Sequence, residues 1–267
     1  MKLAYVYGTS ETVAPVLGAR GDAHTIFPRL KDSGYVAIEP FVRDPKLIDI
    51  VAFEKNLNRY GLEVAAVGTG PVVSDDKLTF TDHKNDSRAE AVKRVKDIVD
   101  FASRFGAPIN IGKLRGEIDV NQPEQSWKWM KEGFIEVCEY AEKRGINIML
   151  EPQNKKNINN IHSTVEALDF IEEMNISNFY LMLDIYHMSF ENRNISSTFA
   201  KAKNKLLHLH FADRNRVVPG KGDFDFGCVI QSLGDIQYEN YISLEVTYEK
   251  DWYEEAKSAA SFLSLLK

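Results

Sequence analysis

Short apolar runs alternate with longer amphipathic stretches along the whole chain. Eight runs are rich in Val, Ile, Leu or Tyr and have the length of buried strands. These predicted strands are Leu3–Tyr7, Tyr35–Pro40, Leu62–Val67, Pro108–Gly112, Ile146–Glu151, Phe179–Asp184, Leu206–Phe211 and Tyr241–Val246. Between them, apolar residues recur at intervals of three and four, which predicts helices. The predicted helices include Ala89–Phe105, Gln125–Lys143, Thr164–Met174 and Trp252–Leu266.

Several of these helices carry start and stop signals. Two Ser-x-x-Glu patterns are typical of capping boxes, Ser87 to Glu90 and Ser163 to Glu166. Gly106 and Gly145 stand where a helix has to end before the next strand begins. Both kinds of signal support the boundaries that the apolar pattern predicts.

The repeated order of strand and helix predicts the fold class. Parallel strands joined by helices place the helices outside the sheet, and eight such units imply that the sheet closes. The length of 267 residues is close to the ~250 that are typical of this architecture. We therefore predict an α/β fold, a (β/α)8 TIM barrel, with residues 1–267 forming one domain. The stretch Thr9–Arg20 is the least helical, and we interpret it as a loop over the barrel mouth.

The amino-acid composition indicates which kinds of partner the protein is expected to bind. The chain has 33 basic and 39 acidic residues, a net charge of −6, which disfavours binding to nucleic-acid phosphates. No apolar run reaches the roughly 18 residues of a membrane span, and the first residues lack the pattern of a signal peptide. The two cysteines, Cys138 and Cys228, have no metal-site spacing. We expect a cytoplasmic protein with a small-molecule substrate and no nucleic-acid or membrane partner.

Four chemistry-bearing residues stand at the ends of successive predicted strands. Glu151, Asp184, His210 and Glu245 follow one another at intervals of 33, 26 and 35 residues, about the length of a strand-plus-helix unit. The carboxyl ends of barrel strands form the rim where TIM-barrel enzymes place their active sites. The spacing therefore predicts that these side chains meet at the rim as a metal site.

This set of side chains also indicates the chemistry. Three carboxylates and one imidazole suit a fairly hard divalent ion, one per chain, with Mn2+ preferred and Mg2+, Co2+ or Zn2+ as alternatives. Such an ion can polarise a carbonyl and stabilise an enediolate. Glu151 and Glu245 would approach the substrate from different sides and share the removal and return of one proton. The predicted activity is that of a metal-dependent enzyme acting next to a carbonyl.

Five segments together resemble the sugar phosphate isomerase/epimerase family of xylose isomerase-like barrels, above all its ketose 3-epimerases of the D-tagatose and D-psicose type. They are Leu150–Asn154, Leu183–Met188, His208–Arg216, Pro219–Phe226 and Ser243–Val246. The resemblance implies an isomerase of carbohydrate metabolism, an epimerase or an aldose–ketose isomerase, that acts on a ketose or ketose phosphate. It also implies a homodimer or homotetramer.

The resemblance assigns roles by position. It implies that Glu151, Asp184, His210 and Glu245 hold the metal and that the two glutamates are also the acid/base pair. It further implies that His187 and Arg216 contact substrate oxygens. His208 shares the inward face of its strand with His210 but lies one layer deeper, so we expect a buried, hydrogen-bonded histidine there.

One departure concerns the substrate. The epimerases usually carry an acidic residue shortly after the position of Asn154, where this chain has Lys155-Lys156-Asn157. The change favours a phosphorylated or acidic substrate. These lysines could form an anion pocket together with Lys113 or Arg115, although solvated lysines are the simpler interpretation.

Two alternatives to the epimerase remain at this stage. Inosose isomerases or dehydratases and hydroxypyruvate isomerase keep the same metal rim, and the four ligands do not separate them. A DNA-repair nuclease of the endonuclease IV type is less favoured, because it needs further histidines on early strands. The chain has six histidines, none of them at the ends of the second to fourth predicted strands.

Overall fold

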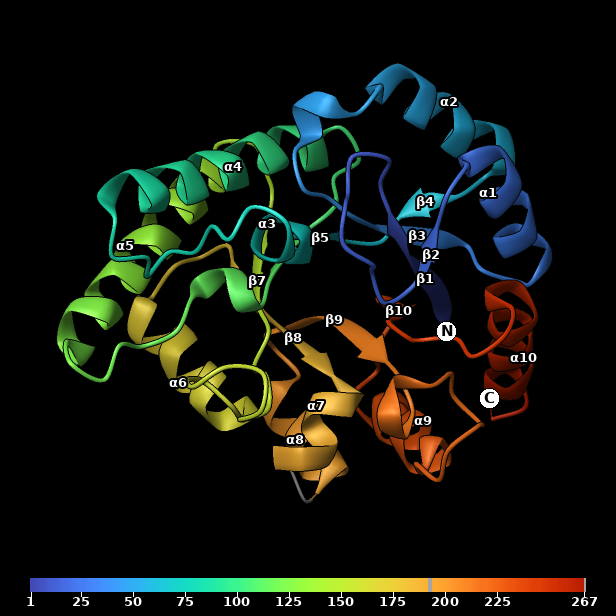
Figure 1. The fold of residues 1–267 in the computed structure, drawn as a ribbon. Coiled ribbons are helices and arrows are strands. Elements are labelled where there is room, and N and C mark those ends of the chain that lie inside the picture. The colour runs from blue at the N-terminus through green and yellow to red at the C-terminus, as the bar shows by residue number, and fades with distance from the viewer. Residues whose placement is uncertain (192–193, 267) are drawn as a thin grey trace.

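A closed ring of parallel strands surrounded by helices forms the centre of the computed structural model, which describes residues 1–191 and 194–266 (Figure 1). The strands are β1 (Lys2–Gly8), β2 (Ala19–Arg20), β3 (Ala37–Phe41), β4 (Glu63–Val64), β5 (Val67–Gly68), β6 (Ile109–Ile111), β7 (Ile148–Leu150), β8 (Phe179–Asp184), β9 (Leu206–Phe211) and β10 (Tyr241–Leu244). The α-helices are α1 (Ala23–Asp32), α2 (Ile50–Tyr60), α3 (Gly70–Ser74), α4 (Asn85–Ser103), α5 (Pro123–Glu142), α6 (Thr164–Met174), α7 (Ile185–Glu191), α8 (Ile195–Ala202), α9 (Phe226–Asp235) and α10 (Trp252–Ser264). Short 3-10 turns are η1 (Pro45–Leu47), η2 (Lys113–Arg115) and η3 (Arg214–Arg216).

Strand pairing closes the barrel. β1 pairs in parallel with β10 on one side, with Lys2 opposite Tyr241, and with β3 on the other, with Ala4 opposite Ala37. The pairing continues through β5, β6, β7, β8 and β9 back to β10. With β4 and β5 sharing the third position, the ring has eight members, which confirms the predicted (β/α)8 TIM barrel. β2 is an additional short strand that pairs with the end of β1.

Most predicted elements appear near their expected limits, and β8, β9 and α6 match them. The third predicted strand, Leu62–Val67, is broken into β4 and β5 instead. The backbone amides change direction there, since the amide of Ala65 donates to Ile38 of β3 while that of Val67 donates to Pro108 on the other side. Because amides two residues apart in a regular strand point to the same neighbour, this change of direction interrupts the strand, although β5 still pairs with β3 at Gly68.

The helix signals have different outcomes. Ser163 and Glu166 form the predicted capping box at the start of α6. The prediction for Ser87 and Glu90 is wrong, because α4 already begins at Asn85 and Ser87 lies inside its first turn. Gly106 and Gly145 adopt positive φ angles of 63° and 66° just beyond α4 and α5, as the predicted helix ends require.

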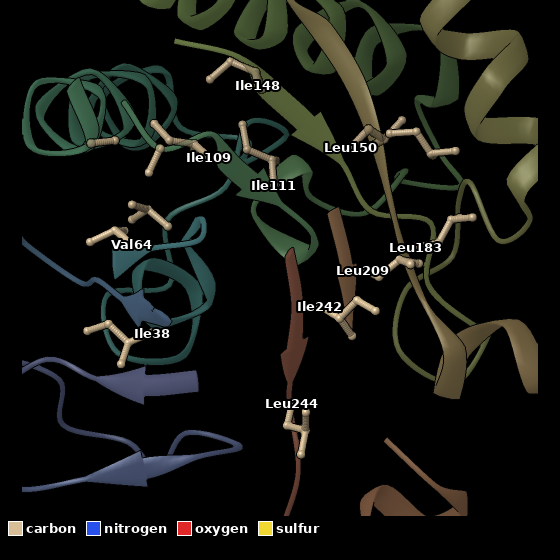
Figure 2. Close-up of a cluster of buried hydrophobic side chains, with 14 of the residues drawn as sticks. Ile38, Val64, Ile109, Ile111, Ile148, Leu150, Leu183, Leu209, Ile242 and Leu244 are labelled. Carbon is tan, nitrogen blue, oxygen red and sulfur yellow. The ribbon is translucent and has the colours of Figure 1, made fainter. Parts of the chain in front are cut away.

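Side-chain alternation divides the strand residues into a layer that faces the helices and is apolar, and a layer inside the barrel that becomes polar toward its carboxyl end. Figure 2 shows the outer layer, where Ile or Leu side chains of β6 to β10 lie side by side around the ring, among them Ile109, Ile148, Leu183, Leu209 and Ile242. Inside the barrel, small alanines fill the amino-terminal end and two methionines the middle. The carboxyl end of the interior is left for polar side chains. Within the described ranges, no helix is long and apolar enough to cross a bilayer.

Candidate active site

The four residues predicted to form the metal site converge inside the carboxyl end of the barrel. Asp184 ends β8 and His210 lies in β9, while Glu151 and Glu245 each follow directly after a strand, β7 and β10. All four are buried. One potential ligand atom from each lies within 4.8 Å of those of the other three. The structure therefore brings together the whole set that the strand-end spacing predicted.

A buried carboxylate of β3, Glu39, orients the histidine of this cluster. Its Oε2 atom accepts hydrogen bonds from Nε2 of His210 at 2.9 Å and from Nε2 of His208 at 3.0 Å. Burial alone would raise the pKa of Glu39, but the two imidazoles outweigh it and hold that pKa well below its usual value. The bond leaves Nδ1 of His210 facing Glu245 at 3.5 Å without a hydrogen-bond partner. His208 is buried and hydrogen-bonded as predicted, one layer below the cluster.

Glu39 is a site residue that the sequence analysis missed. It is an acidic residue in an otherwise apolar predicted strand, Tyr35–Pro40. A carboxylate in such a run would be expensive to bury without a partner. That signal was available and would have placed Glu39 inside the barrel.

Two amides hold one oxygen of Glu151 in place. Oε2 of Glu151 accepts from Nδ2 of Asn110 at 3.2 Å and from Nε2 of Gln153 at 2.8 Å. Gly112 leaves room for this arrangement, since a Cβ atom there would lie 2.5 Å from Oε2 of Glu151 and 2.6 Å from Nε2 of Gln153. Neither amide was predicted, because an Asn or Gln at a strand end has many structural explanations.

Arg216 and His187, the predicted substrate contacts, lie against the same cluster. Nη1 of Arg216 donates to Oδ2 of Asp184 and to Oε2 of Glu245, both at 2.6 Å. Nη2 of Arg216 donates to Nε2 of His187 at 3.0 Å, and Nδ1 of His187 lies 2.7 Å from the side-chain amide of Asn154. Burial lowers the pKa of His187 to about 4, so its imidazole is neutral around pH 7 and can accept this bond.

The charge balance of the cluster fits a bound cation. Three buried carboxylates are crowded around Arg216, and burial together with neighbouring Glu245 raises the pKa of Glu151 to about 7. Like charges this close disfavour one another unless a cation neutralises them. The unpartnered Nδ1 of His210 faces the same point, which is where a ligand nitrogen is needed. A carboxylate that fixes the far ring nitrogen, as Glu39 does, is the usual support of a metal-binding histidine.

A cavity of about 500 Å³ opens above this cluster. Glu151, Glu245, His187 and Arg216 line its floor, and residues 15–17 of the first loop form part of its wall. This agrees with the interpretation of Thr9–Arg20 as a loop over the barrel mouth, except that its last two residues form β2. A volume of this size is within the ~300–1,000 Å³ range of small-molecule sites.

Arg115 cannot contribute to an anion pocket. Its side chain is fully buried and donates to the backbone carbonyls of Gly112, at 2.9 Å, and Glu151, at 2.7 Å. Further bonds reach the carbonyl and side-chain oxygens of Asn160. Five N–H donors in a planar fork suit such a set of carbonyls. Arg115 therefore ties the loops after β6 and β7 together.

The lysines after β7 also lie differently from the predicted pocket. Lys155 and Lys156 are exposed, and the ammonium of Lys156 lies 5.1 Å from the ring centre of Phe190. Among the described residues that line the cavity, Asn157 and Lys113 appear but these two lysines do not. The part of the predicted anion pocket assigned to Arg115 is therefore wrong, whereas the exposure of Lys155 and Lys156 agrees with the simpler, solvated interpretation, and Lys113 does line the cavity.

The family model of the xylose isomerase-like TIM barrel matches residues 27–266, and the chain belongs to that family. This confirms the resemblance drawn from the sequence. An L-ribulose 3-epimerase of Mesorhizobium japonicum is 24% identical over 234 residues, which are 85% of this chain and 76% of that protein. An L-ribulose 3-epimerase of a Methylomonas species is 29% identical over 218 residues, 80% of this chain and 74% of that protein.

Solved structures show the same fold. A D-psicose 3-epimerase from Clostridium cellulolyticum H10, solved with D-tagatose, superimposes with a TM-score of 0.84 at 22% identity, covering 100% of this chain and 99% of that one. The named relatives are sugar epimerases, which agrees with the predicted class of enzyme, an isomerase or epimerase.

Proposed function

We propose that this protein is a metal-dependent epimerase of a ketose or ketose derivative, which removes a proton from a carbon next to the carbonyl and returns it to the opposite face. The observation that carries the proposal is the placement of Glu151 and Glu245. They follow strands β7 and β10, which two other strands separate in the ring, yet their carboxylates reach the same cluster. The sugar 3-epimerases among the relatives give independent support.

Glu151, Asp184, His210 and Glu245 would hold the divalent ion, for which Mn2+ is our first choice. When bound, this ion would polarise the substrate carbonyl and lower the energy of the enediolate that forms on proton removal. The remaining catalytic work falls to the side chains.

Proton transfer is assigned to the two glutamates. One carboxylate takes the proton from the carbon next to the carbonyl, and the electron pair of the broken C–H bond enters the enediolate. The other glutamate, in its acid form, gives a proton to the opposite face of the same carbon, so that the configuration inverts. Since Asn110 and Gln153 both bind Oε2 of Glu151, its Oε1 atom is the oxygen left for the substrate or the ion.

Substrate positioning is assigned to Arg216 and His187. Both line the cavity beside the acid/base pair. The guanidinium of Arg216 already donates to Asp184 and Glu245, so its planar fork is oriented before a substrate enters. A sugar hydroxyl that enters would take the place of Arg216 as the hydrogen-bond partner of Nε2 of His187.

Deuterium exchange tests the proposal. The Mn2+-loaded protein is incubated in D2O with a panel of free, phosphorylated and glycosylated ketoses, inososes and hydroxypyruvate, and the products are examined by NMR. We expect deuterium at carbon 3 of a ketose together with the appearance of its epimer. Exchange confined to inososes or hydroxypyruvate would assign one of the alternative reactions, and no exchange in any ketose would reject the epimerase.

A further inference from the structure

A second cavity of about 530 Å³ adjoins the one above the metal cluster. Three residues line both cavities: Val73 of α3, Lys113 at the start of η2, and Asn157 in the loop after β7. The second cavity extends away from the cluster, between the segments that follow α3, β6 and β7. A ligand that has one end at Glu151 and Glu245 and extends past the three shared residues would enter the second cavity.

The walls of the second cavity are held by bonds that also hold Glu151. Arg115 joins the carbonyl of Glu151 to that of Gly112, the residue before η2. Further out, the amide and carbonyl of Ile118 exchange two hydrogen bonds of 2.8 Å with the side chain of Asn159. These contacts join the loops after β6 and β7 along the cavity, so its shape is formed before any ligand binds.

The lining of the second cavity suits a sugar better than an anionic group. Hydrogen-bonding side chains around it include hydroxyl, imidazole and carboxylate groups: Thr79, Thr81, His83, Glu117 and Asp119. With two carboxylates against the single ammonium of Lys113, a phosphate would meet repulsion. Val73, Ile118 and Ile158 add apolar surface for the C–H faces of a sugar ring. Mixed donors, acceptors and apolar surface are what a neutral polyhydroxyl ligand requires.

We propose that this second cavity binds a glycosyl unit attached to a distal hydroxyl of the reacting ketose, so that the substrate class is a glycosylated ketose rather than a free monosaccharide. The inference rests on the proposed function for the position of the ketose end. It does not depend on the metal identity or on which carbon reacts.

Binding of disaccharides with a ketose end tests the subsite. Isothermal titration of the Mn2+-loaded protein compares D-fructose with isomaltulose and leucrose, which carry a glucosyl group on the O6 and O5 atoms of fructose, away from carbon 3. We expect at least one disaccharide to bind about tenfold tighter than fructose, equivalent to roughly one or two net hydrogen bonds. Thr79→Trp, which fills the second cavity, should remove this advantage and leave fructose binding unchanged.

Two further variants complete the test. Thr25→Trp places the same bulk on an exposed position of α1 and should change neither affinity. Glu117→Ala adds no bulk and should weaken disaccharide binding alone, which covers the case of a misfolded Thr79→Trp. Disaccharides that bind no tighter than fructose to the wild type, or variants that weaken both sugars equally, would overturn the subsite. If deuterium enters no ketose while the Thr79-dependent affinity persists, the subsite stands and the epimerase is rejected.

Discussion

The second half of the barrel, from β7 to β10, supplies all four residues of the candidate metal site, whereas the first half supplies most of the cavity walls. Two of the late strands, β8 and β9, have the limits that the apolar pattern predicts, and each late strand carries a proposed ligand near its carboxyl end or directly after it. The first half contains the broken strand β4–β5 and the short helix α3. Regular strands deliver side chains to a fixed point, while irregular connections leave room for a substrate.

The two halves do not have fully separate roles, because residues of the first half also position the proposed metal ligands of the second half. Glu39 of β3 orients His210, and Asn110 of β6 holds Glu151. Gly112 keeps free the space into which Glu151 extends. The comparison therefore separates residues that would carry the reaction from residues that shape and support the place where it occurs.

Among the changes considered, removal of the metal from the second half of the barrel should cause the largest loss of activity. We expect chelation with EDTA to abolish epimerisation and added Mn2+ to restore it, because three crowded carboxylates cannot polarise a carbonyl by themselves. Elemental analysis and circular dichroism are measured on the same samples. Full activity in protein that contains no metal would contradict the metal site.

Replacing either acid/base residue should cost nearly as much. Glu151→Gln and Glu245→Gln should each lower kcat by at least about 10²-fold, the lower end of what a positioned acid or base contributes. Metal content is the control, since both residues are also proposed ligands. A Glu245→Gln enzyme that keeps both its metal and its turnover would reject the two-carboxylate mechanism.

Gly112→Ala tests whether the first half acts on the second by position alone. The added Cβ would displace the carboxylate of Glu151, and a misplacement of about 1 Å can cost up to about 10²-fold in rate. We expect a loss of about ten- to a hundredfold in kcat, with little change in the denaturant midpoint, because the displaced atoms are side-chain ends.

Gly234→Ala in α9 is the matched control. An added Cβ there meets no atom within 4 Å, so activity should be unchanged. Equal activity of the Gly112 and Gly234 variants would show that the close packing around Glu151 is unimportant.

Glu39→Gln should lower the affinity for the metal without changing the contacts with the substrate. Loss of the carboxylate behind His210 is expected to lower metal affinity about 10- to 100-fold, with most of the turnover recovered at saturating Mn2+. Competition with a fluorescent chelator measures the affinity. An unchanged affinity would leave Glu39 as a packing residue only.

The smallest effect is expected for the two lysines after β7. Replacing Lys155 and Lys156 by Ala should change kcat/KM less than about twofold for both a neutral and a phosphorylated ketose, because exposed charges contribute little in water. A large and salt-sensitive rise in KM for the phosphorylated ketose alone would restore the predicted anion pocket.

The sequence by itself determined most of the elements, the closed barrel and the four residues that meet at its rim. Those predictions depend on local periodicity and on the rule that parallel strands end at one face, which hold whatever the neighbouring side chains are. The start of α4 differs from its prediction because the helix already begins at Asn85, two residues before the predicted cap residue Ser87.

Only the tertiary structure decided which side chains support the site and which shape the cavity. Arg115, expected to face an anion, is buried among backbone carbonyls, and Glu39 bonds to His210 across 171 positions of the chain. The break between β4 and β5 depends on the backbone amides of Ala65 and Val67 turning toward opposite neighbours. Such outcomes are set by partners that are distant in sequence, because a buried polar group must take whichever donor or acceptor the closed barrel brings within reach.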